Sequence, residues 1–369
     1  MSADTVLISV VMTIFSRSSY MEEAVRSILN QTYKKIEFLI IVEHGADSQA
    51  VAMLEQLARE DGRIRLLYNP RRLGLAESLN FGIREARGKY IARMDDDDVS
   101  LPQRLKKQLT YMESHEEVGL CGTLQISITP HKTDITTAPV EAESLKSEML
   151  FGCQLSHTSV MFRRELFLAN GWFYNPAKLA EDYDLWMRIL NKTKMVNLAE
   201  PLVKHRFGFG NLSLDKGEAL AEEFNQAIQH NLQCYLGINC SSYPKEIFCS
   251  WRRFPENKTE EEMAKLLTKH LDLLLEMEKK NRIRAFAEAS AFMGMLMHRF
   301  RWFYKEIVRR TGKAEFFACI VEPYRLKPEM EFWENLVALV EIMMNENKQC
   351  SLSLPDRSVV DMCLNAVSE

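Results

Sequence analysis

Hydrophobic and polar positions follow two alternating patterns over the first 114 residues. Four short runs are rich in apolar and β-branched side chains, as expected for strands: residues 7–12, 36–42, 63–68 and 90–94. Four other segments have helical spacing of apolar residues or helix-end signals, with Ser48 the expected N-cap of the second: residues 20–30, 48–61, 75–86 and 101–114. Repeated strand–helix units predict an α/β fold with a parallel sheet and right-handed crossovers.

Polar and aromatic groups follow three of the predicted strands. Thr13 and Phe15 follow the first strand, Glu43 follows the second, and the run Asp95–Asp98 follows the fourth. Ligands of parallel sheets bind at the carboxyl ends of strands. We therefore expect these groups to line one crevice.

The second half of the chain changes character near Leu214. Residues 118–213 combine short strand-like runs at 159–162 and 195–198 with one strong helix around EDYDLWMRIL. From Leu214 onward the pattern is almost entirely helical, and Thr259 followed by glutamates suits a helix N-terminus. We therefore predict a boundary at Leu214 between an α/β domain and a helical C-terminal region.

Composition excludes several classes of protein. The chain has 369 residues, 46% of them hydrophobic and 27% charged, with a net charge of -4, so no basic excess indicates a nucleic-acid partner. The N-terminus does not resemble a signal peptide, and no apolar run reaches the roughly 18 residues of a membrane span. Eight cysteines lie scattered without a C-x-x-C pair. These features favour a cytoplasmic protein with reduced thiols.

The run Asp95–Asp98 is the first candidate site. Four adjacent carboxylates at the end of a buried strand suit a hard divalent cation such as Mg²⁺ or Mn²⁺. The alternative is a solvated acidic loop that favours the dipole of the next helix. One or two of the four aspartates are expected to do only that.

The segment AEDYDLWMRIL holds the second candidate site. Glu181, Asp182 and Asp184 open an amphipathic helix, and a carboxylate beside an apolar wall can act as a general base. Simple N-capping by Asp182 or Asp184 is an equally good explanation from this segment alone. His157 is a third candidate, although a lone histidine before a strand is more often structural.

Taken together, these motifs resemble family 2 glycosyltransferases, which are inverting enzymes of the GT-A fold. The resemblance covers about the first 210 residues, and the motifs that carry it are ISVVMTIFSRSSYMEEAVRSILNQTYKKIEFLIIVE, NPRRLGLAESLNFGIREARGKYIARMDDDDVSLPQRLKKQ, SHTSVMFRRELF and AEDYDLWMRI. It implies a GT-A type, Rossmann-like, mostly parallel sheet flanked by helices. It also implies a catalytic domain over 1–213, with nucleotide-sugar binding over about 1–123 and the acceptor side over about 124–213.

The resemblance also implies donor-side roles. Thr13, Phe15 and Glu43 match positions that hold the nucleoside of the donor. Asp95 and Asp97 match the D-x-D metal motif, with Asp96 between them, and Asp97 is the expected direct ligand of Mn²⁺ or Mg²⁺.

Acceptor-side roles follow in the same way. Asp182, the second member of the Glu181–Asp182 pair, matches the catalytic base. His157, Trp172 and Arg206 fall where family members shape the sugar or acceptor pocket. The reaction so implied moves a sugar from a nucleotide-sugar to a hydroxyl of a surface polysaccharide or glycolipid, with inversion through an oxocarbenium-like transition state.

Three positions depart from the common family pattern. Where the second strand usually ends Asp-Asp-Gly-Ser, this chain has Glu43 and His44 followed by glycine, so UDP is favoured as the donor nucleotide without being fixed. Leu79 stands where many members have an arginine facing the diphosphate, and Arg93 is our hypothesis for its replacement. The histidine that usually lies two residues after the position of Arg206 is absent, so a third protein contact to the metal is not assigned.

Other functions remain as alternatives. The string DDDDV also fits the D-x-D-x-V motif of metal-dependent phosphatases, although that motif normally follows the first strand of its domain. A sugar-phosphate nucleotidyltransferase requires a glycine-rich loop after the first strand, and MTIFSRSSY contains no glycine. A catalytically inactive sugar-nucleotide binding protein acting through its helical tail is the non-enzyme alternative.

The region 214–369 has two interpretations. Its segment RIRAFAEASAFMGMLMHRFRWFYKEIVRR mixes aromatic, methionine and basic residues, which suits peripheral contact with a membrane surface or a lipid-linked saccharide. We favour the alternative, in which the helices pack on the catalytic domain or form a homo-oligomer through a second subunit.

Overall fold

The computed structural model describes residues 6–16, 18–208, 217–248 and 258–311. The chain divides into two compact units, Met1–Glu223 and Phe224–Glu369. The predicted boundary at Leu214 lies outside the described residues.

The first half of the first unit contains the predicted strand–helix units. In chain order they are β1 (Ile8–Ile14), α1 (Met21–Leu29), β2 (Ile36–Val42), α2 (Ser48–Glu60), β3 (Ile64–Tyr68), α3 (Leu75–Glu85) and β4 (Tyr90–Arg93). Every residue of β1 and β2 is buried, which confirms the prediction of strands covered on both faces. The expected N-cap of α2 was wrong by one residue, because the side chain of Asp47 accepts the Ala50 N–H at 2.9 Å.

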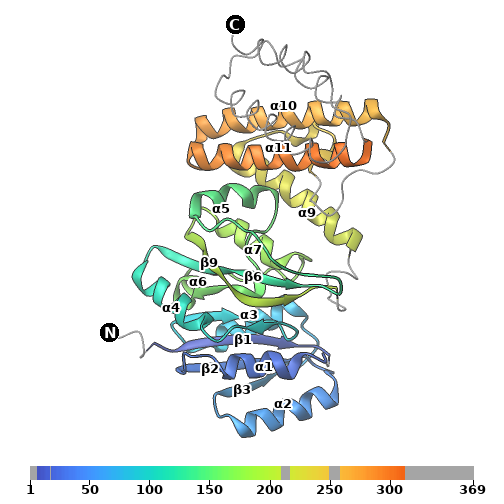
Figure 1. The fold of residues 1–369 in the computed structure, drawn as a ribbon. Coiled ribbons are helices and arrows are strands. Elements are labelled where there is room, and N and C mark those ends of the chain that lie inside the picture. The colour runs from blue at the N-terminus through green and yellow to red at the C-terminus, as the bar shows by residue number, and fades with distance from the viewer. Residues whose placement is uncertain (1–5, 17, 209–216, 249–257, 312–369) are drawn as a thin grey trace. The chain divides into compact units, whose positions relative to one another are not determined.

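The second half of this unit extends the sheet. Its elements are β5 (Val99–Ser100), α4 (Arg104–Ser114), β6 (Val118–Ile128), β7 (Thr133–Ile135), α5 (Ala142–Glu148), β8 (Met161–Arg163), α6 (Arg164–Asn170), α7 (Glu181–Ile189) and β9 (Lys194–Arg206). The sheet has the order β3-β2-β1-β4-β8-β6-β9-β5, with β7 paired to β6, and helices flank it (Figure 1). Strands β1–β4 are parallel, whereas β8, β5 and β7 pair antiparallel to their neighbours, so the sheet is mixed.

The strand order brings the candidate groups to one edge of the sheet. β1 lies between β2 and β4, and in register Thr13 pairs with Ile41 and Val11 pairs with Arg93. Phe15, Glu43 and Asp95 therefore follow the carboxyl ends of three adjacent parallel strands, as expected. Gly88 permits β4 to enter this arrangement, because a Cβ there would lie 2.6 Å from the backbone nitrogen of Ser9.

The second unit is helical in the described residues. The helix α9 (Gly217–Asn231) begins in the first unit and ends in the second, where α10 (Glu260–Arg284) packs against α11 (Ala289–Thr311). Thr259 caps α10 as expected, since it accepts the Glu262 N–H at 3.3 Å while the Glu262 carboxylate accepts the Thr259 N–H at 2.8 Å. In its core His270 stacks on Phe303 with ring centroids 4.1 Å apart.

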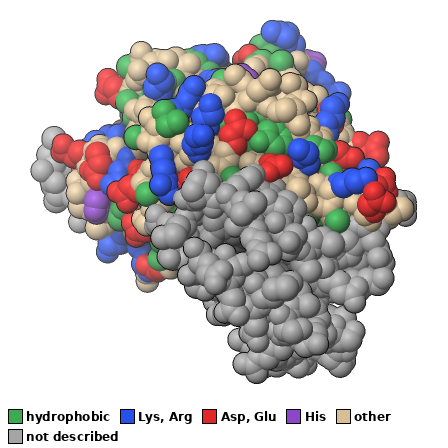
Figure 2. All heavy atoms as spheres, turned by 90° about the horizontal axis from the view of Figure 1, so that it is seen from above, with side chains coloured by type: hydrophobic (Ala, Val, Ile, Leu, Met, Phe, Trp, Pro, Cys, Tyr) green, Lys and Arg blue, Asp and Glu red, His purple; other side chains and the backbone are tan. Residues whose placement is uncertain are grey.

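Few large hydrophobic side chains are exposed among the described residues. The large hydrophobic side chains exposed there are Tyr68, Ile135 and Ile283. In the space-filling view, basic and acidic side chains alternate and apolar side chains form small separate areas (Figure 2). None of the described helices has the length and hydropathy needed to span a bilayer. The membrane-surface interpretation stays a prediction.

Candidate active site

The run Asp95–Asp98 leaves β4 and turns into β5. The Asp98 side chain is fully buried and its Oδ1 accepts the backbone N–H of Arg206 at 2.9 Å. The guanidinium of Arg206 donates to the Asp97 carbonyl at 2.5 Å and to Glu23 at 2.6 Å. Asp95 to Asp97 are half-buried. The loop is therefore fixed at its second end and partly open to ligands at its first.

Burial, together with crowding, raises the pKa values of Asp96, Asp97 and Asp98. Burial, followed by the negative charges of Asp95 and Asp97, raises the pKa of Asp96 to about 7. Burial and Asp95 raise that of Asp97 to about 6. Asp98 also has a raised pKa, mainly through burial, although the Arg206 N–H and the Thr158 side chain donate hydrogen bonds to its carboxylate. Negative charge in this run is incompletely compensated by the protein.

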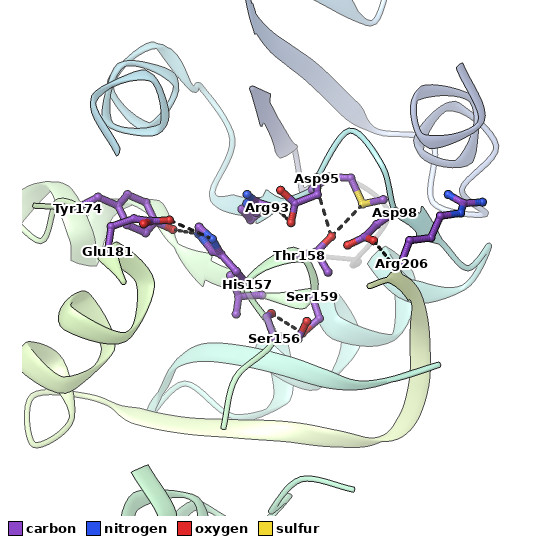
Figure 3. A network of polar contacts seen from close by, with 12 residues as sticks. Arg93, Asp95, Asp98, Ser156, His157, Thr158, Ser159, Tyr174, Glu181 and Arg206 are labelled. Atoms are coloured by element: carbon purple, nitrogen blue, oxygen red, sulfur yellow. Dashed lines mark hydrogen bonds and ion pairs between the residues drawn. The ribbon is translucent and has the colours of Figure 1, made fainter. Parts of the chain in front are cut away.

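Arg93 is the nearest counter-charge. Its side chain is only 4% exposed, it forms an ion pair with Asp95, and its Nε has no hydrogen-bond partner. Arg93 and Asp95 lie between the group formed by Tyr174, Glu181 and His157 and the pair Asp98–Arg206 (Figure 3). Arg93 thus faces both candidate carboxylate groups from between them.

The donor atoms of this run fit a hard divalent cation. They are carboxylate oxygens, which Mg²⁺ and Mn²⁺ prefer, and the negative charge of Asp95 adds to burial in raising the pKa values of Asp96 and Asp97. Within the ranges that the structure describes, no group of three or more His, Cys, Asp or Glu side chains is arranged to hold a metal. A cation here would need ligands beyond those that the chain presents together.

Glu43 is occupied by donors of its own chain. Its carboxylate accepts the backbone N–H groups of His44 at 2.8 Å, Leu73 at 3.0 Å and Gly74 at 2.7 Å, and the side-chain amide of Asn69 at 3.2 Å. Burial opposes ionisation, but these donors outweigh it and lower the pKa of Glu43. Glu43 therefore fixes the loop that enters α3, where Gly74 adopts a φ of 79°. Its predicted contact with a nucleobase stays a prediction.

Thr13 and Phe15 lie where the pattern predicted them. Thr13 is the penultimate residue of β1 and is buried, and Phe15 follows the strand and is half-buried. Their assignment to the donor nucleoside stays a prediction.

Glu181 and Asp182 open α7 on the other side of Arg93. Burial, together with the neighbouring charge of Asp182, raises the pKa of Glu181 to about 8. Burial also raises the pKa of Asp182, whose Oδ1 accepts the Tyr183 N–H at 2.7 Å. The N-cap of α7 is Ala180, and Asp184 pairs with Arg188 at 2.8 Å. Neither Asp182 nor Asp184 is the N-cap residue, so the N-capping explanation was wrong.

His157 connects Glu181 to a tyrosine. Its Nε2 lies 2.9 Å from the hydroxyl oxygen of Tyr174, and its Nδ1 lies 3.8 Å from Glu181 Oε1 (Figure 3). Burial, and then the charge of Arg93, lowers the pKa of His157 well below its usual value. The imidazole is therefore neutral near pH 7, and its edge faces the ring of Trp186 with centroids 6.4 Å apart.

Of the other two predicted acceptor residues, Trp172 joins the aromatic cluster of Phe167 and Trp186 beside His157, and Arg206 lies elsewhere. Trp172 packs edge-on against Phe167, with centroids 5.4 Å apart. Arg206 lies beside the Asp95–Asp98 run, with its guanidinium 4.1 Å from the ring centre of Tyr20. The structure brings together His157, Glu181 and Asp182, and it places Arg206 with the donor-side carboxylates.

Two residues of this group were absent from the prediction. Tyr174 is buried, and its backbone exchanges two hydrogen bonds with the side chain of Asn80, at 2.8 and 2.9 Å. The Sγ of Cys153 lies 4.0 Å from Asp182 Oδ2. Both are single residues in loops, and no spacing pattern marks them in the sequence.

Comparison with known proteins identifies the family of this fold and site. Residues 9–167 match the family model for glycosyl transferase family 2. An uncharacterized glycosyltransferase of Methanocaldococcus jannaschii is 32% identical over 208 residues, which are 55% of this chain and 71% of that protein. The O-antigen biosynthesis glycosyltransferase WbnJ of Escherichia coli is 32% identical over 204 residues, covering 54% of this chain and 79% of WbnJ.

A solved structure supports the fold. The S. aureus protein TarS, residues 1–349 in complex with UDP-GlcNAc, aligns over 86% of this chain and 91% of its own with a TM-score of 0.54 and 14% sequence identity. This similarity indicates that the mixed sheet and its flanking helices have a GT-A type of architecture. On the strength of the matched relatives, the chain belongs to glycosyltransferase family 2.

Proposed function

We propose that this chain is an inverting glycosyltransferase of the hexosyltransferase type that moves a sugar from a UDP-sugar to a hydroxyl group of a saccharide or lipid-linked saccharide. The observation that carries the proposal is the pair of carboxylate groups, one partly open and one mostly buried, on two sides of Arg93. WbnJ acts in O-antigen biosynthesis and the TarS structure holds UDP-GlcNAc, which supports a surface polysaccharide as product and UDP as carrier. Residues 1–213 form the proposed catalytic domain.

On the donor side, Asp95 and Asp97 would hold Mn²⁺ or Mg²⁺. A bound divalent cation supplies positive charge that stabilises the leaving diphosphate. Arg93 adds a fixed charge from beneath the same run. Thr13 and Phe15 contact the nucleoside, and Glu43 shapes its pocket through the loop that it fixes.

On the acceptor side, Asp182 is the general base. It takes the proton of the acceptor hydroxyl while that oxygen attacks the anomeric carbon and the bond from that carbon to the diphosphate breaks. Attack from the face opposite the diphosphate inverts the anomeric centre. Glu181, with its pKa of about 8, is protonated at pH 7 and does not compete for that proton. The neutral His157 and Tyr174 complete the wall of the acceptor pocket.

Calorimetric titration of UDP with and without Mn²⁺ tests the donor site. We expect binding that requires Mn²⁺ and falls at least tenfold in Asp97→Asn, because the variant loses a charged ligand of the cation. Asp134→Asn is the matched control, since Asp134 lies on the exposed strand β7 and pairs with Lys132.

The contradicting result has two forms. Mn²⁺-independent UDP binding that Asp97→Asn leaves unchanged would remove the metal assignment. If UDP does not bind but GDP or dTDP does, the carrier assignment is wrong and the transferase assignment stands.

A further inference from the structure

The helix that carries Glu181 and Asp182 begins without a cap of its own. Its N-cap residue is Ala180, at φ -102° and ψ 60°, and alanine has no side-chain acceptor for the unpaired N–H groups of the first turn. Serine, threonine, aspartate or asparagine usually occupies this position. Ala180 therefore caps none of the first-turn N–H groups, and the Tyr183 N–H is accepted by the Asp182 carboxylate instead.

Glu223, on α9, holds the two residues that lead into α7. Its Oε1 accepts the backbone N–H groups of Leu179 and Ala180, both at 2.9 Å, and its Oε2 accepts that of Leu179 at 3.2 Å. Glu223 lies in the same compact unit as α7 although it is 43 residues beyond Ala180 in the chain. Two consecutive N–H groups thus converge on one carboxylate immediately before the catalytic pair.

This contact fixes the backbone that aims Asp182. Hydrogen bonds to a charged acceptor are stronger than neutral ones, and here they hold the two residues that set the direction of the first turn. Asp182 is two residues beyond Ala180, and its Oδ1 is itself oriented by the Tyr183 N–H. Displacement of a reacting group by about 1 Å costs on the order of 100-fold in rate.

We propose that Glu223 is a positioning residue for the general base, through its hydrogen bonds to the residues that precede α7. The proposal rests on the proposed function of Asp182. It also extends the functional part of the first unit beyond the predicted catalytic domain, 1–213, and beyond residues 9–167 that the family model matches. Glu223 itself then acts on the orientation of the general base from beyond both of these ranges.

Full-length variants test this role. Glu223→Ala removes every acceptor, whereas Glu223→Gln keeps one carbonyl oxygen that can replace Oε1 toward Leu179 and Ala180. Glu222→Ala is the matched control, because Glu222 is the exposed neighbouring carboxylate on α9. A panel of UDP-hexoses is first screened for the one that the wild type hydrolyses fastest, and kcat is measured with that donor. The other two readouts are the calorimetric affinity for UDP with Mn²⁺ and the hydrogen exchange of the peptide spanning 177–185.

We expect Glu223→Ala to lower kcat by about 10- to 100-fold while its affinity for UDP stays within twofold. Glu223→Gln should recover most of this loss, and Glu222→Ala should match the wild type. Exchange of the Leu179 and Ala180 amides should accelerate in Glu223→Ala by at least tenfold and remain slow in Glu222→Ala. If the alanine variant does not fold, the glutamine variant decides, with a kcat only a few-fold below the wild type, faster exchange of the Leu179 and Ala180 amides and unchanged UDP affinity as the expected result.

Three outcomes overturn the proposal. They are a kcat within twofold of the wild type in Glu223→Ala, equal loss of kcat and UDP affinity, and amide exchange that does not change. A fully active Asp182→Asn variant, or a wild type that turns over no UDP-hexose, would overturn the proposed function and the positioning role with it. Exchange is measured without substrate, so the contact between Glu223 and α7 is judged separately from the chemistry.

Discussion

The two carboxylate groups of this enzyme differ in how their charge is balanced. The Asp95–Asp98 run is partly open and lies beside two arginines, Arg93 and Arg206, although burial raises the pKa values of Asp96, Asp97 and Asp98 there too. The Glu181–Asp182 pair lies beside a neutral histidine and a tyrosine, and burial raises both pKa values. Aspartate can therefore serve as a ligand for cations in one environment and as an acceptor of protons in the other.

Replacement of Asp182, the proposed base, should have the largest effect on kcat. A small effect would remove the distinction between the two carboxylate groups. We expect Asp182→Asn to lower kcat by about 10²- to 10⁴-fold, because the amide cannot accept the hydroxyl proton. Affinity for UDP with Mn²⁺ should stay within twofold. Asp184→Asn, on the same helix and paired with Arg188, is the matched control. A similar loss in both variants would point to damage to α7 rather than to loss of a base.

The pKa of Glu181 predicts how stability depends on pH. The pKa is about 8 in the folded protein and 4.5 in a model glutamate, so the folded state binds this proton more tightly than the unfolded state does. Its contribution to stability is complete below pH 4.5 and is lost as the pH rises through 8. Glu181→Gln carries no such proton, so at pH 9 its free energy of unfolding should exceed that of the wild type, on the order of a few kcal/mol.

Urea unfolding at pH 5 and pH 9 measures this difference, with the pH 5 pair of curves as the internal control. A difference between wild type and variant that is equal at both pH values would show that Glu181 is ionised at neutral pH. The Glu181–Asp182 pair would then carry two negative charges at neutral pH, and its contrast with the Asp95–Asp98 run would be lost.

The sequence predicted the first part of the fold well for a physical reason. Strands such as β1 and β2 are buried on both faces, so they appear as continuous apolar runs. The long strand β9 was predicted only over 195–198 and β6 was missed, because much of β9 and the last five residues of β6 are half-buried or exposed. A strand of that kind has no apolar run, and pairing across the sheet determines it.

The same distinction applies to the candidate site. Asp95, Asp97 and Asp182 stood out because they form charged clusters at element ends. Tyr174 and Glu223 did not, because they act through contacts with residues far along the chain, Tyr174 with Asn80 and Glu223 with Leu179 and Ala180. Such contacts depend on tertiary packing and leave no local spacing in the sequence.

The charge of Arg93 acts on both carboxylate groups. Its replacement should have the smallest of these effects and tests whether the two groups are electrostatically linked. Its charge acts to lower the pKa values of Asp97, Glu181 and Asp182. In Arg93→Met we expect the acidic limb of the kcat profile to move to higher pH, because a base with a higher pKa needs a higher pH to be ionised. Affinity for UDP with Mn²⁺ should fall about tenfold, the size of one lost hydrogen bond to a charged group.

These two readouts separate the possible roles of Arg93, and Arg26→Met on the exposed face of α1 is the control. Unchanged UDP affinity with a shifted pH profile would mean that Arg93 serves the carboxylates alone and does not contact the diphosphate. Weaker UDP binding with an unshifted profile would confine it to the donor side. Only a change in both would show that one buried cation sets the charge on the metal ligands and on the base together, so that the two groups are electrostatically a single site.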